Sequence, residues 1–259
     1  MLLIGFVAGV TLAVRQARRM GLNPDVIYSF AFWIFVAGIV GARVFFVIQY
    51  HEQFWRENPV AMIGAVVNIT EGGLVVYGAF LGVVLAGFVF LRVHKLPVLA
   101  FADLIVPSLA LGLAIGRIGC FLNGCCYGGP CELPWAVSFP AGTEVAARYP
   151  RGPDAASLPV HPAQLYAAID AGLLAALAVA FTPLARRAGE VFALVLTLHP
   201  ISRLLLEAIR VDEPPALGTP LSISQLVSLV LLALAAALWW WIGRRAAAEA
   251  PGPAGRGRL

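Results

Sequence analysis

The feature that most constrains this chain is a series of apolar runs, each followed by a shorter segment that carries charge. A helix needs about 20 apolar residues to cross the hydrocarbon core of a bilayer. The pattern therefore predicts an all-α, polytopic membrane protein with about seven transmembrane helices. The runs are Leu2–Val14, Val26–Gln49, Gly73–Leu91, Leu99–Ile115, Pro162–Leu184, Glu190–Ile209 and Ile223–Ile242.

The composition supports this interpretation. The chain is 60% hydrophobic and 12% charged, whereas soluble domains carry about 25% charged residues. That is too little charge to cover a surface that faces water. The net charge of +4 is small and lies mostly in short arginine clusters between the runs, which argues against a nucleic-acid-binding face.

The basic residues also predict an orientation. They follow the odd-numbered runs, and the alternate loops are poorer in charge for their length. The positive-inside rule then places the N-terminus outside and the C-terminus in the cytoplasm. Residues 1–245 are predicted to form one transmembrane domain with an outer loop at 128–161, and residues 246–259 a disordered cytoplasmic tail. The clusters are Arg15, Arg18 and Arg19; Arg92 and Lys95; Arg186 and Arg187; and Arg244, Arg245, Arg256 and Arg258.

The segment Gly116–Gly128, Gly-Arg-Ile-Gly-Cys-Phe-Leu-Asn-Gly-Cys-Cys-Tyr-Gly, follows the fourth run without a break. It places Arg117 at or near the end of a membrane segment, where a guanidinium costs about 2.5–3.5 kcal/mol on insertion scales. Glycines beside it allow backbone to approach a ligand closely, and Asn123 adds an amide. These properties make Arg117 a candidate functional residue.

Four arginines lie inside or at the edge of apolar runs: Arg43, Arg117, Arg203 and Arg210. Arg203, Glu207 and Arg210 are spaced i, i+4 and i+7, so they share one helix face, which must point into the bundle or a wet cavity. The arginine fork binds phosphate well, so the set predicts a site for a phospholipid headgroup. The alternative is structural pairing of Glu207 with Arg203 or Arg210, with snorkelling at helix ends.

Two further motifs carry polar groups at helix starts. In His161-Pro-Ala-Gln-Leu-Tyr166, Pro162 suits a first helical position, His161 and Gln164 share a face, and Tyr166 points elsewhere. An ordinary helix start with an interfacial tyrosine is the simpler alternative. The second motif is Gly72–Ala79, at the start of the third run. Its glycines flank Tyr77, which looks buried, and allow close packing or the approach of a ligand. Asp103 is expected to cap its own helix or to meet an arginine.

All four cysteines, Cys120, Cys125, Cys126 and Cys131, lie in one segment. The predicted orientation places them on the oxidising side, where disulfides persist. A structural disulfide, free packing thiols and a metal or catalytic role all remain open. Because the spacing C-x4-C-C-x4-C matches no familiar metal-binding pattern, no residue is predicted as a metal ligand.

Taken together, the motifs resemble those of the bacterial prolipoprotein diacylglyceryl transferases, in the same order over about residues 4–245. The chain departs from the family pattern at four positions: Cys120 replaces an Asn, Cys125 a Glu, Tyr77 a His that is common there, and Ala167 an acidic residue. The matching motifs are Gly41-Ala-Arg43, Gly72–Gly78, Gly116–Gly128, His161–Tyr166, Arg203-x-x-x-Glu207-x-x-Arg210 and Ser222-x-x-Gln225.

The resemblance implies a transferase of the bacterial cytoplasmic (inner) membrane. It would move the diacylglyceryl group of phosphatidylglycerol onto the lipobox cysteine of a prolipoprotein, with glycerol phosphate as leaving group and without a cofactor, metal or nucleic-acid partner. The implied catalytic residues are Arg117, Arg203 and Tyr77. The implied phosphatidylglycerol-binding residues are Arg117, Arg43, Arg210, Glu207, Asn123, Gly128, His161, Gln164 and Tyr166.

The proton acceptor for the substrate thiol, whose ordinary pKa is about 8.5, is left open by the replacement at Tyr77. Tyr77 itself with a lowered pKa, direct depression of the thiol pKa by the arginines, and His161 are the three alternatives. Other functions remain as well: a non-catalytic or altered-acceptor relative that binds phospholipid, an anion transporter, and a thiol–disulfide oxidoreductase, for which the chain lacks a Cys-x-x-Cys motif.

Overall fold

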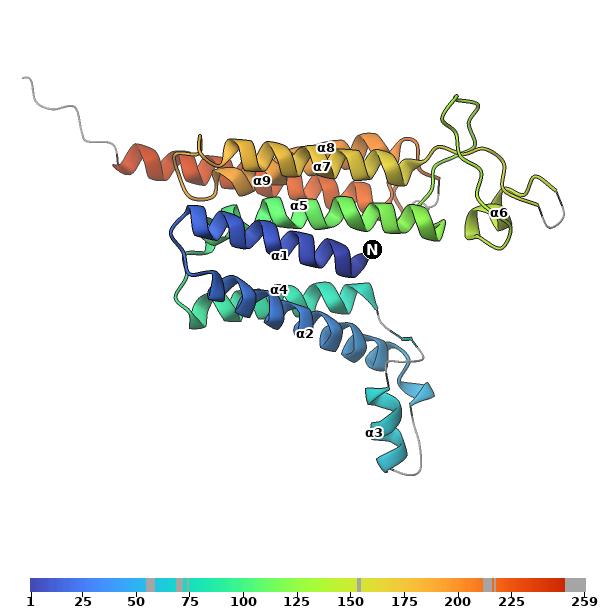
Figure 1. Ribbon diagram of the computed structural model, residues 1–259, viewed down its shortest axis with the longest axis horizontal. Helices are drawn as coiled ribbons and strands as arrows, with labels where there is room; N and C mark the ends of the chain where they lie inside the picture. The colour runs from blue at the N-terminus through green and yellow to red at the C-terminus, as the bar shows by residue number, and fades with distance from the viewer. Residues whose placement is uncertain are drawn as a thin grey trace, which may run out of the picture. The chain divides into compact units, whose positions relative to one another are not determined.

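The computed structural model describes residues 1–54, 59–68, 72–73, 75–152, 155–211, 216 and 218–249. Within these ranges the regular elements are all helices (Figure 1), which confirms the predicted all-α class. They are α1 (Leu2–Arg19), α2 (Pro24–Gln49), η1 (His51–Gln53), α3 (Pro59–Val67), α4 (Val76–Val93), α5 (Val98–Asn123), α6 (Glu144–Arg148), α7 (Ala163–Phe181), α8 (Glu190–Glu207) and α9 (Ile223–Glu249).

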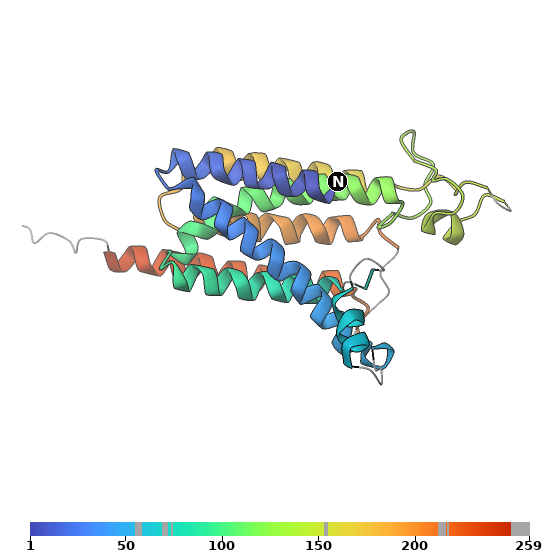
Figure 2. The ribbon, with the colours of Figure 1, turned by 60° about the horizontal axis from the view of Figure 1, so that its bottom comes forward.

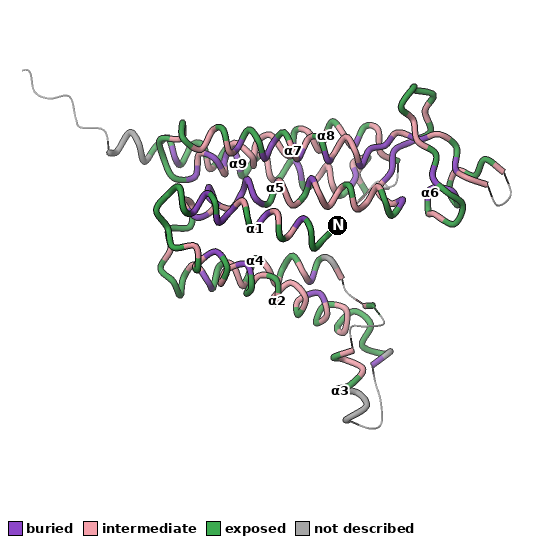
Figure 3. Tube along the Cα trace, viewed as in Figure 1, coloured by how far each residue is buried: buried purple, intermediate pink, exposed green. Residues whose placement is uncertain are grey.

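Four helical segments of the described chain are long and apolar enough to cross a membrane: Pro24–Gln49, Val98–Asn123, Ala163–Phe181 and Ile223–Arg244. A shorter apolar helix covers Tyr77–Val93. Many large apolar side chains on these helices are exposed, for example Phe32, Phe80 and Leu85, and Figure 3 shows exposed residues along most of α2 and α4. Such surfaces suit lipid rather than water. The membrane assignment is therefore supported, while the count of seven spans stays a prediction.

The chain divides into two compact units, each described by itself. One comprises Met1–Ala13 with Leu99–Leu259, and the other Val14–Val98. In the Val14–Val98 unit, α2 packs directly against α4 through glycines. A Cβ on Gly41 would lie 2.4 Å from the carbonyl oxygen of Gly78, and one on Gly82 would lie 2.3 Å from that of Ala37. Only glycine allows the two backbones to approach so closely.

In the larger unit, α5 packs against α7 and α8. Small and branched side chains form this core, such as Val106 with Ala178 and Val191, and Ala110 with Leu174. Asp103 in α5 accepts hydrogen bonds from the backbone N–H groups of Gly189 (2.6 Å) and Phe192 (2.8 Å). It therefore caps α8, and the expectation that it would cap its own helix or meet an arginine is wrong.

The described part of the outer loop predicted at 128–161, which excludes residues 153–154, is folded in this unit. Tyr127, Phe139, Val145 and Val160 form a small buried core, and a β-bridge joins Val137 to Val160. Figures 1 and 2 both place the loop beyond the ends of α5 and α7, the two helices that it connects. The helices thus bring the loop to one end of their bundle.

Several predicted boundaries differ from the observed ones, for local reasons. Gly72 and Gly73 have φ angles of +89° and +78°, so α4 begins at Val76 rather than at Gly73. The fourth predicted run continues as α5 through Arg117 to Asn123, and α7 begins at Ala163, one residue after Pro162. The helix α9 reaches Glu249, so the first residues of the predicted tail are helical. The remainder, 250–259, lies outside the described residues.

Candidate active site

The signature segment, Gly116–Gly128, ends α5 in a glycine cap that brings two cysteines together. Gly124 has a φ of +70°, and its N–H donates to the carbonyl of Phe121 (3.2 Å). The N–H of Cys125 donates to the carbonyl of Cys120, also at 3.2 Å. These two bonds define a Schellman motif. In this motif the residue that donates the hydrogen bond closing the longer of the two loops, here Cys125, commonly contacts the side chain of the residue that accepts it, here Cys120. The motif therefore places Cys125 next to Cys120.

A third thiol joins this pair. The Sγ atoms of Cys120, Cys125 and Cys126 all lie within 4.8 Å of one another, and each cysteine is free. Burial and the neighbouring Cys125 raise the pKa of the Cys126 thiol, although Arg210 and Arg117 oppose this effect. Cys126 is therefore a weak nucleophile by itself at neutral pH. Cys131, the fourth cysteine, lies outside this cluster.

Gly128 is the point where three chain segments meet. Its N–H donates to the carbonyl of His161 (3.1 Å), the N–H of Gly129 donates to that of Ile209 (3.0 Å), and a bridge pairs Gly128 with Arg210. A Cβ at this position would lie 2.6 Å from the Cβ of His161. Because Gly128 has no side chain, the backbones of the signature segment, the start of α7 and the end of α8 can meet here.

The motif at the start of α7 holds the signature segment in place. Gln164 is 1% exposed and donates from Nε2 to the carbonyl of Cys125 (2.8 Å). Its Oε1 and the Nδ1 of His161 are buried without a hydrogen-bond partner among the described residues. The hydroxyl of Tyr166 instead accepts a hydrogen bond from Trp135 Nε1 in the outer loop (2.7 Å). Tyr166 thus points elsewhere, as the sequence indicated.

Arg203 forms an ion pair with Glu207 one turn further along α8, as the structural alternative predicted. Its Nη2 also donates to Ser224 (2.7 Å), and Ser222 donates to the other oxygen of Glu207 (2.6 Å). Ser222 and Gln225 form a reciprocal capping box at the start of α9, a pattern that is readable from sequence as S-x-x-Q. This network fixes the Arg203 guanidinium between α8 and α9.

Arg117 differs from Arg203 in its surroundings. No hydrogen bond or ion pair joins it to another residue in the described part of the chain. It lies close enough to Cys126 and to His199 to act electrostatically on both. Arg117 is therefore a half-buried positive charge in α5 whose donors face no protein acceptor among those residues.

His199 and Asp170 were missed by the sequence analysis. Asp170 in α7 accepts a hydrogen bond from Ser202 in α8 (2.8 Å), and Asp170, Arg117 and Arg203 all act electrostatically on the ring of His199. The spacing of His199 and Arg203 at i, i+4 on one helix was the available signal. This spacing places the titratable ring of His199 on the same face of α8 as Arg203.

In the Val14–Val98 unit, Arg43 has a different environment. All five N–H donors of its guanidinium are used by backbone carbonyls at and beyond the C-terminal end of α3, where helix carbonyls lack partners. The ring centroids of Phe46 and Phe54 each lie 5.3 Å from its Cζ. The acceptors are Ala65 (2.8 Å), Val66 (2.8 Å), Asn68 (2.6 Å), Gly72 (3.0 Å) and Gly73 (2.9 Å).

Two predicted site residues are exposed. Tyr77, in the first turn of α4, is 68% exposed, so the expectation that it is buried is wrong. Asn123, the last residue of α5, is exposed as well.

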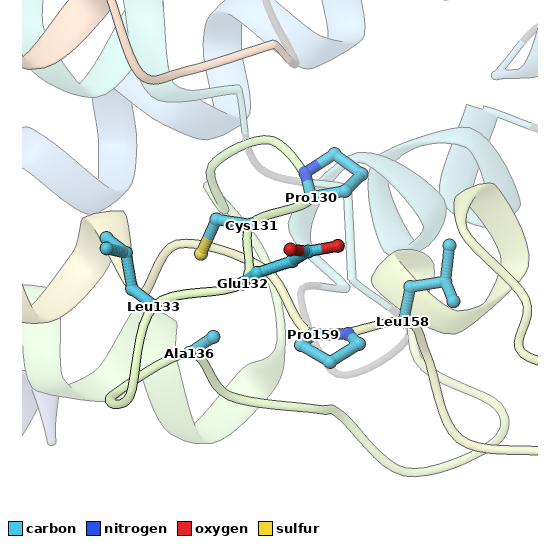
Figure 4. A pocket seen from close by; sticks show the side chains of 7 residues that line it. All are labelled: Pro130, Cys131, Glu132, Leu133, Ala136, Leu158 and Pro159. Carbon is cyan, nitrogen blue, oxygen red and sulfur yellow. The ribbon is translucent and has the colours of Figure 1, made fainter.

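A separate hollow of about 570 Å³ lies in the outer loop (Figure 4), lined by Pro130, Cys131, Glu132, Leu133, Ala136, Leu158 and Pro159. None of the arginines lines it.

Comparison with known proteins places these features in a family. A family model described as prolipoprotein diacylglyceryl transferase matches residues 1–241. The chain belongs to this family. A protein of Gloeobacter violaceus named phosphatidylglycerol–prolipoprotein diacylglyceryl transferase is 35% identical over 254 residues, which cover 97% of this chain and 90% of that protein. One of the same name from Clostridium tetani is 32% identical, covering 88% of this chain and 86% of its own.

A longer relative of the same name comes from Rhodopirellula baltica. It is 46% identical over 147 residues, which cover 56% of this chain but only 30% of that protein. The match to the family model over residues 1–241 includes the signature segment, the start of α7 and the end of α8, which meet at Gly128. Three motifs that the sequence showed as separate patterns therefore meet at Gly128.

Proposed function

We propose that this chain transfers the diacylglyceryl group of phosphatidylglycerol to the thiol of a prolipoprotein lipobox cysteine and releases glycerol phosphate. The family match over residues 1–241 carries the proposal. Arg117 supports it, because its guanidinium has no protein acceptor among the described residues and suits an anionic headgroup.

In the proposed reaction, the sulfur of the substrate thiolate attacks the glyceryl carbon next to the phosphate. A carbon–sulfur bond forms, the carbon–oxygen bond to phosphate breaks, and its electron pair leaves with glycerol phosphate. Negative charge therefore grows on the phosphate oxygens in the transition state. Arg117 stabilises this charge, and such fixed electrostatic groups are most effective where water is excluded.

Arg203 is the second catalytic arginine in this proposal. Its ion pair with Glu207 and its bond to Ser224 hold the guanidinium in one position, so it needs no reorganisation when charge develops. Gly128 places Arg210 beside the signature segment, and Gln164 fixes the Cys125 carbonyl. Asn123, His161 and Tyr166 complete the proposed headgroup-binding set, whereas Arg43 contributes by holding α3 rather than by contacting lipid.

The substrate thiol must transfer its proton to a base. Tyr77, one of the three alternatives from the sequence, has a hydroxyl whose ordinary pKa of about 10 makes it a poor base unless cations lower it. His199 lies with Arg117 and Arg203 in one unit, and a histidine titrates near neutral pH. We therefore propose His199 as the acceptor and retain Tyr77 as the residue against which to test it.

The topology of the proposed enzyme has seven transmembrane helices in the bacterial inner membrane. The N-terminus faces outward and the C-terminus faces the cytoplasm. The arginine clusters at the C-terminal end of α1, after α7 and in α9 support this orientation, because short cytoplasmic segments carry an excess of basic residues. Phosphatidylglycerol and the signal peptide of a prolipoprotein are then both available from the membrane.

The test is transfer in vitro. Purified protein in detergent is mixed with phosphatidylglycerol and a lipobox peptide, and mass spectrometry of the peptide reads the product. We expect the peptide to gain a diacylglyceryl group on its cysteine, and a peptide with Ser in place of that cysteine to stay unmodified. Binding of phosphatidylglycerol without transfer to the cysteine peptide would contradict the proposal and indicate a relative with another acceptor or none.

A further inference from the structure

The three clustered thiols are not explained by binding a phosphate headgroup. We infer that Cys120, Cys125 and Cys126 form a site for one sulfur-preferring divalent metal ion of the Zn²⁺ class, with one coordination position left open. The sequence spacing gave no reason to expect a metal ligand here. The inference therefore comes from the tertiary arrangement of the thiols.

The distances between the thiols suit a shared ion. A Zn–S bond is about 2.3 Å long, so two thiolates on one tetrahedral zinc ion lie about 3.8 Å apart. The three Sγ atoms lie within 4.8 Å of one another, so small side-chain rotations bring them to that spacing. A disulfide requires about 2.05 Å between two sulfurs and leaves the third without a partner.

The backbone around the thiols is fixed before any ion binds. The glycine cap at Gly124 sets Cys120 beside Cys125, and Gln164 holds the Cys125 carbonyl. Cys126 adopts a left-handed φ of +60°, which is uncommon for a residue other than glycine, and such conformations are enriched at functional sites. This conformation turns the third thiol back toward the other two.

The charges near the cluster also suit a metal thiolate. Three thiolates and a divalent cation carry a net charge of −1. Arg117 and Arg210 both act electrostatically on Cys126, and positive groups nearby stabilise such a centre. Beside the cluster, the buried Oε1 of Gln164 has no partner among the described residues. It can accept a hydrogen bond from water on the ion.

The open position distinguishes this site from a structural one. Structural zinc sites have four protein ligands, whereas catalytic sites have three and bind water or substrate in the fourth position. The only other cysteine of the chain, Cys131, lies outside the cluster. The site thus offers a place where a further sulfur ligand can bind.

That ligand is the acceptor thiol, a step that rests on the proposed function. The ion binds the lipobox sulfur as thiolate, and the proton passes to His199 or to water. The bound sulfur then attacks the glyceryl carbon, the carbon–oxygen bond breaks, and glycerol phosphate leaves. The product is a neutral thioether, a weaker ligand than a thiolate, so it dissociates. No oxidant or reductant is required.

The first experiment measures metal content independently of activity. Full-length protein without a histidine tag is purified in detergent, loaded with Zn²⁺, desalted and analysed by elemental mass spectrometry. We expect one equivalent of zinc per chain. Co²⁺ in its place should produce a thiolate-to-cobalt charge-transfer band. The variants Cys120→Ser and Cys125→Ser should lose both signals, and Cys131→Ser, the matched control in the same segment, should retain them.

Circular dichroism and thermal unfolding check that each variant is folded. If one variant unfolds, thiol alkylation of the unaltered protein replaces it: Zn²⁺ should protect Cys120, Cys125 and Cys126 from alkylation and leave the reactivity of Cys131 unchanged. Zinc at background level in the unaltered protein, or a disulfide within the cluster after purification under native conditions, overturns the inference.

The second experiment separates this inference from the proposed function. Transfer to the lipobox peptide is measured before and after zinc is removed with a chelator, and again after Zn²⁺ is restored. We expect activity to fall at least tenfold and to recover. Full activity without zinc overturns the role of the ion in transfer but not the transferase. Stoichiometric zinc with no transfer under any condition refutes the transferase and leaves the metal site.

Discussion

Arg43 and Arg117 look alike in sequence, because each is a guanidinium within an apolar helix beside small residues. In the structure they differ. Arg43 donates all five of its N–H groups to carbonyls near the end of α3, whereas Arg117 has no hydrogen-bond acceptor among the described residues.

The difference shows that two kinds of arginine occur in this membrane protein. A guanidinium whose donors are all used by backbone carbonyls stabilises local structure, and one with donors left over can bind a ligand. Arg203 lies between these extremes, since Glu207 and Ser224 hold it. Substitution at the three positions should therefore alter activity and stability in different proportions.

The largest effect is expected at Arg117. The change Arg117→Gln should reduce transfer about 10²–10³-fold, the loss seen when one fixed transition-state donor is removed. Its melting temperature should stay near that of the unaltered protein. Arg117→Lys keeps the charge but loses the fork, so its activity should be intermediate. Equal activity in Arg117→Gln and in the unaltered protein would show that Arg117, like Arg43, does not act in the reaction.

The proton acceptor should give the next largest effect. Replacing His199 with Phe should lower the rate about 10²-fold, the lower end of what a general base contributes, and should abolish the rise of kcat/KM on the acidic side of the pH profile. Tyr77→Phe is the comparison, and its pH profile should keep its shape. The reverse result, with the profile altered only by Tyr77→Phe, would return the role of base to Tyr77.

A smaller effect is expected from loosening Arg203. In Glu207→Gln the amide still accepts from Ser222, but the ion pair with Arg203 is lost. A misplacement of about 1 Å can cost up to 10²-fold in rate, and we expect about a tenfold loss. Ser222→Ala is the matched control, because it removes the hydrogen bond from Ser222 to Glu207 and leaves the ion pair in place. A larger loss in Ser222→Ala than in Glu207→Gln would show that the ion pair is not what orients Arg203.

Arg43 should affect stability more than chemistry. The change Arg43→Gln leaves several carbonyls without donors, and hydrogen bonds to charged groups are worth about 1.5–3 kcal/mol each. We expect a lower melting temperature and loss of activity only in proportion to the fraction of protein that is unfolded. Thermal unfolding and transfer are measured on the same sample. A large drop in kcat with an unchanged melting temperature would place Arg43 with Arg117.

Some of the site was predictable from sequence because it depends on local patterns. Hydrophobic length located the helices, and the i, i+4, i+7 spacing placed Arg203, Glu207 and Arg210 on one face. The Asn123-Gly124 pair and the S-x-x-Q pattern at Ser222 are also local signals. Conversely, the sequence analysis assigned Tyr77 to the interior and overlooked His199, because side-chain burial and the neighbours of a ring depend on which helices pack together.

The sequence by itself determined that this chain is an all-helical protein suited to a membrane and a member of the diacylglyceryl transferase family, since apolar length and motif order are properties of the linear chain. Only the tertiary structure decided which charges are neutralised and which motifs meet. Gly128 joins three segments, Gln164 reaches back to Cys125, and α3 ends against Arg43. Those contacts join residues far apart in the sequence, and they form only when backbone donors and acceptors find partners away from water.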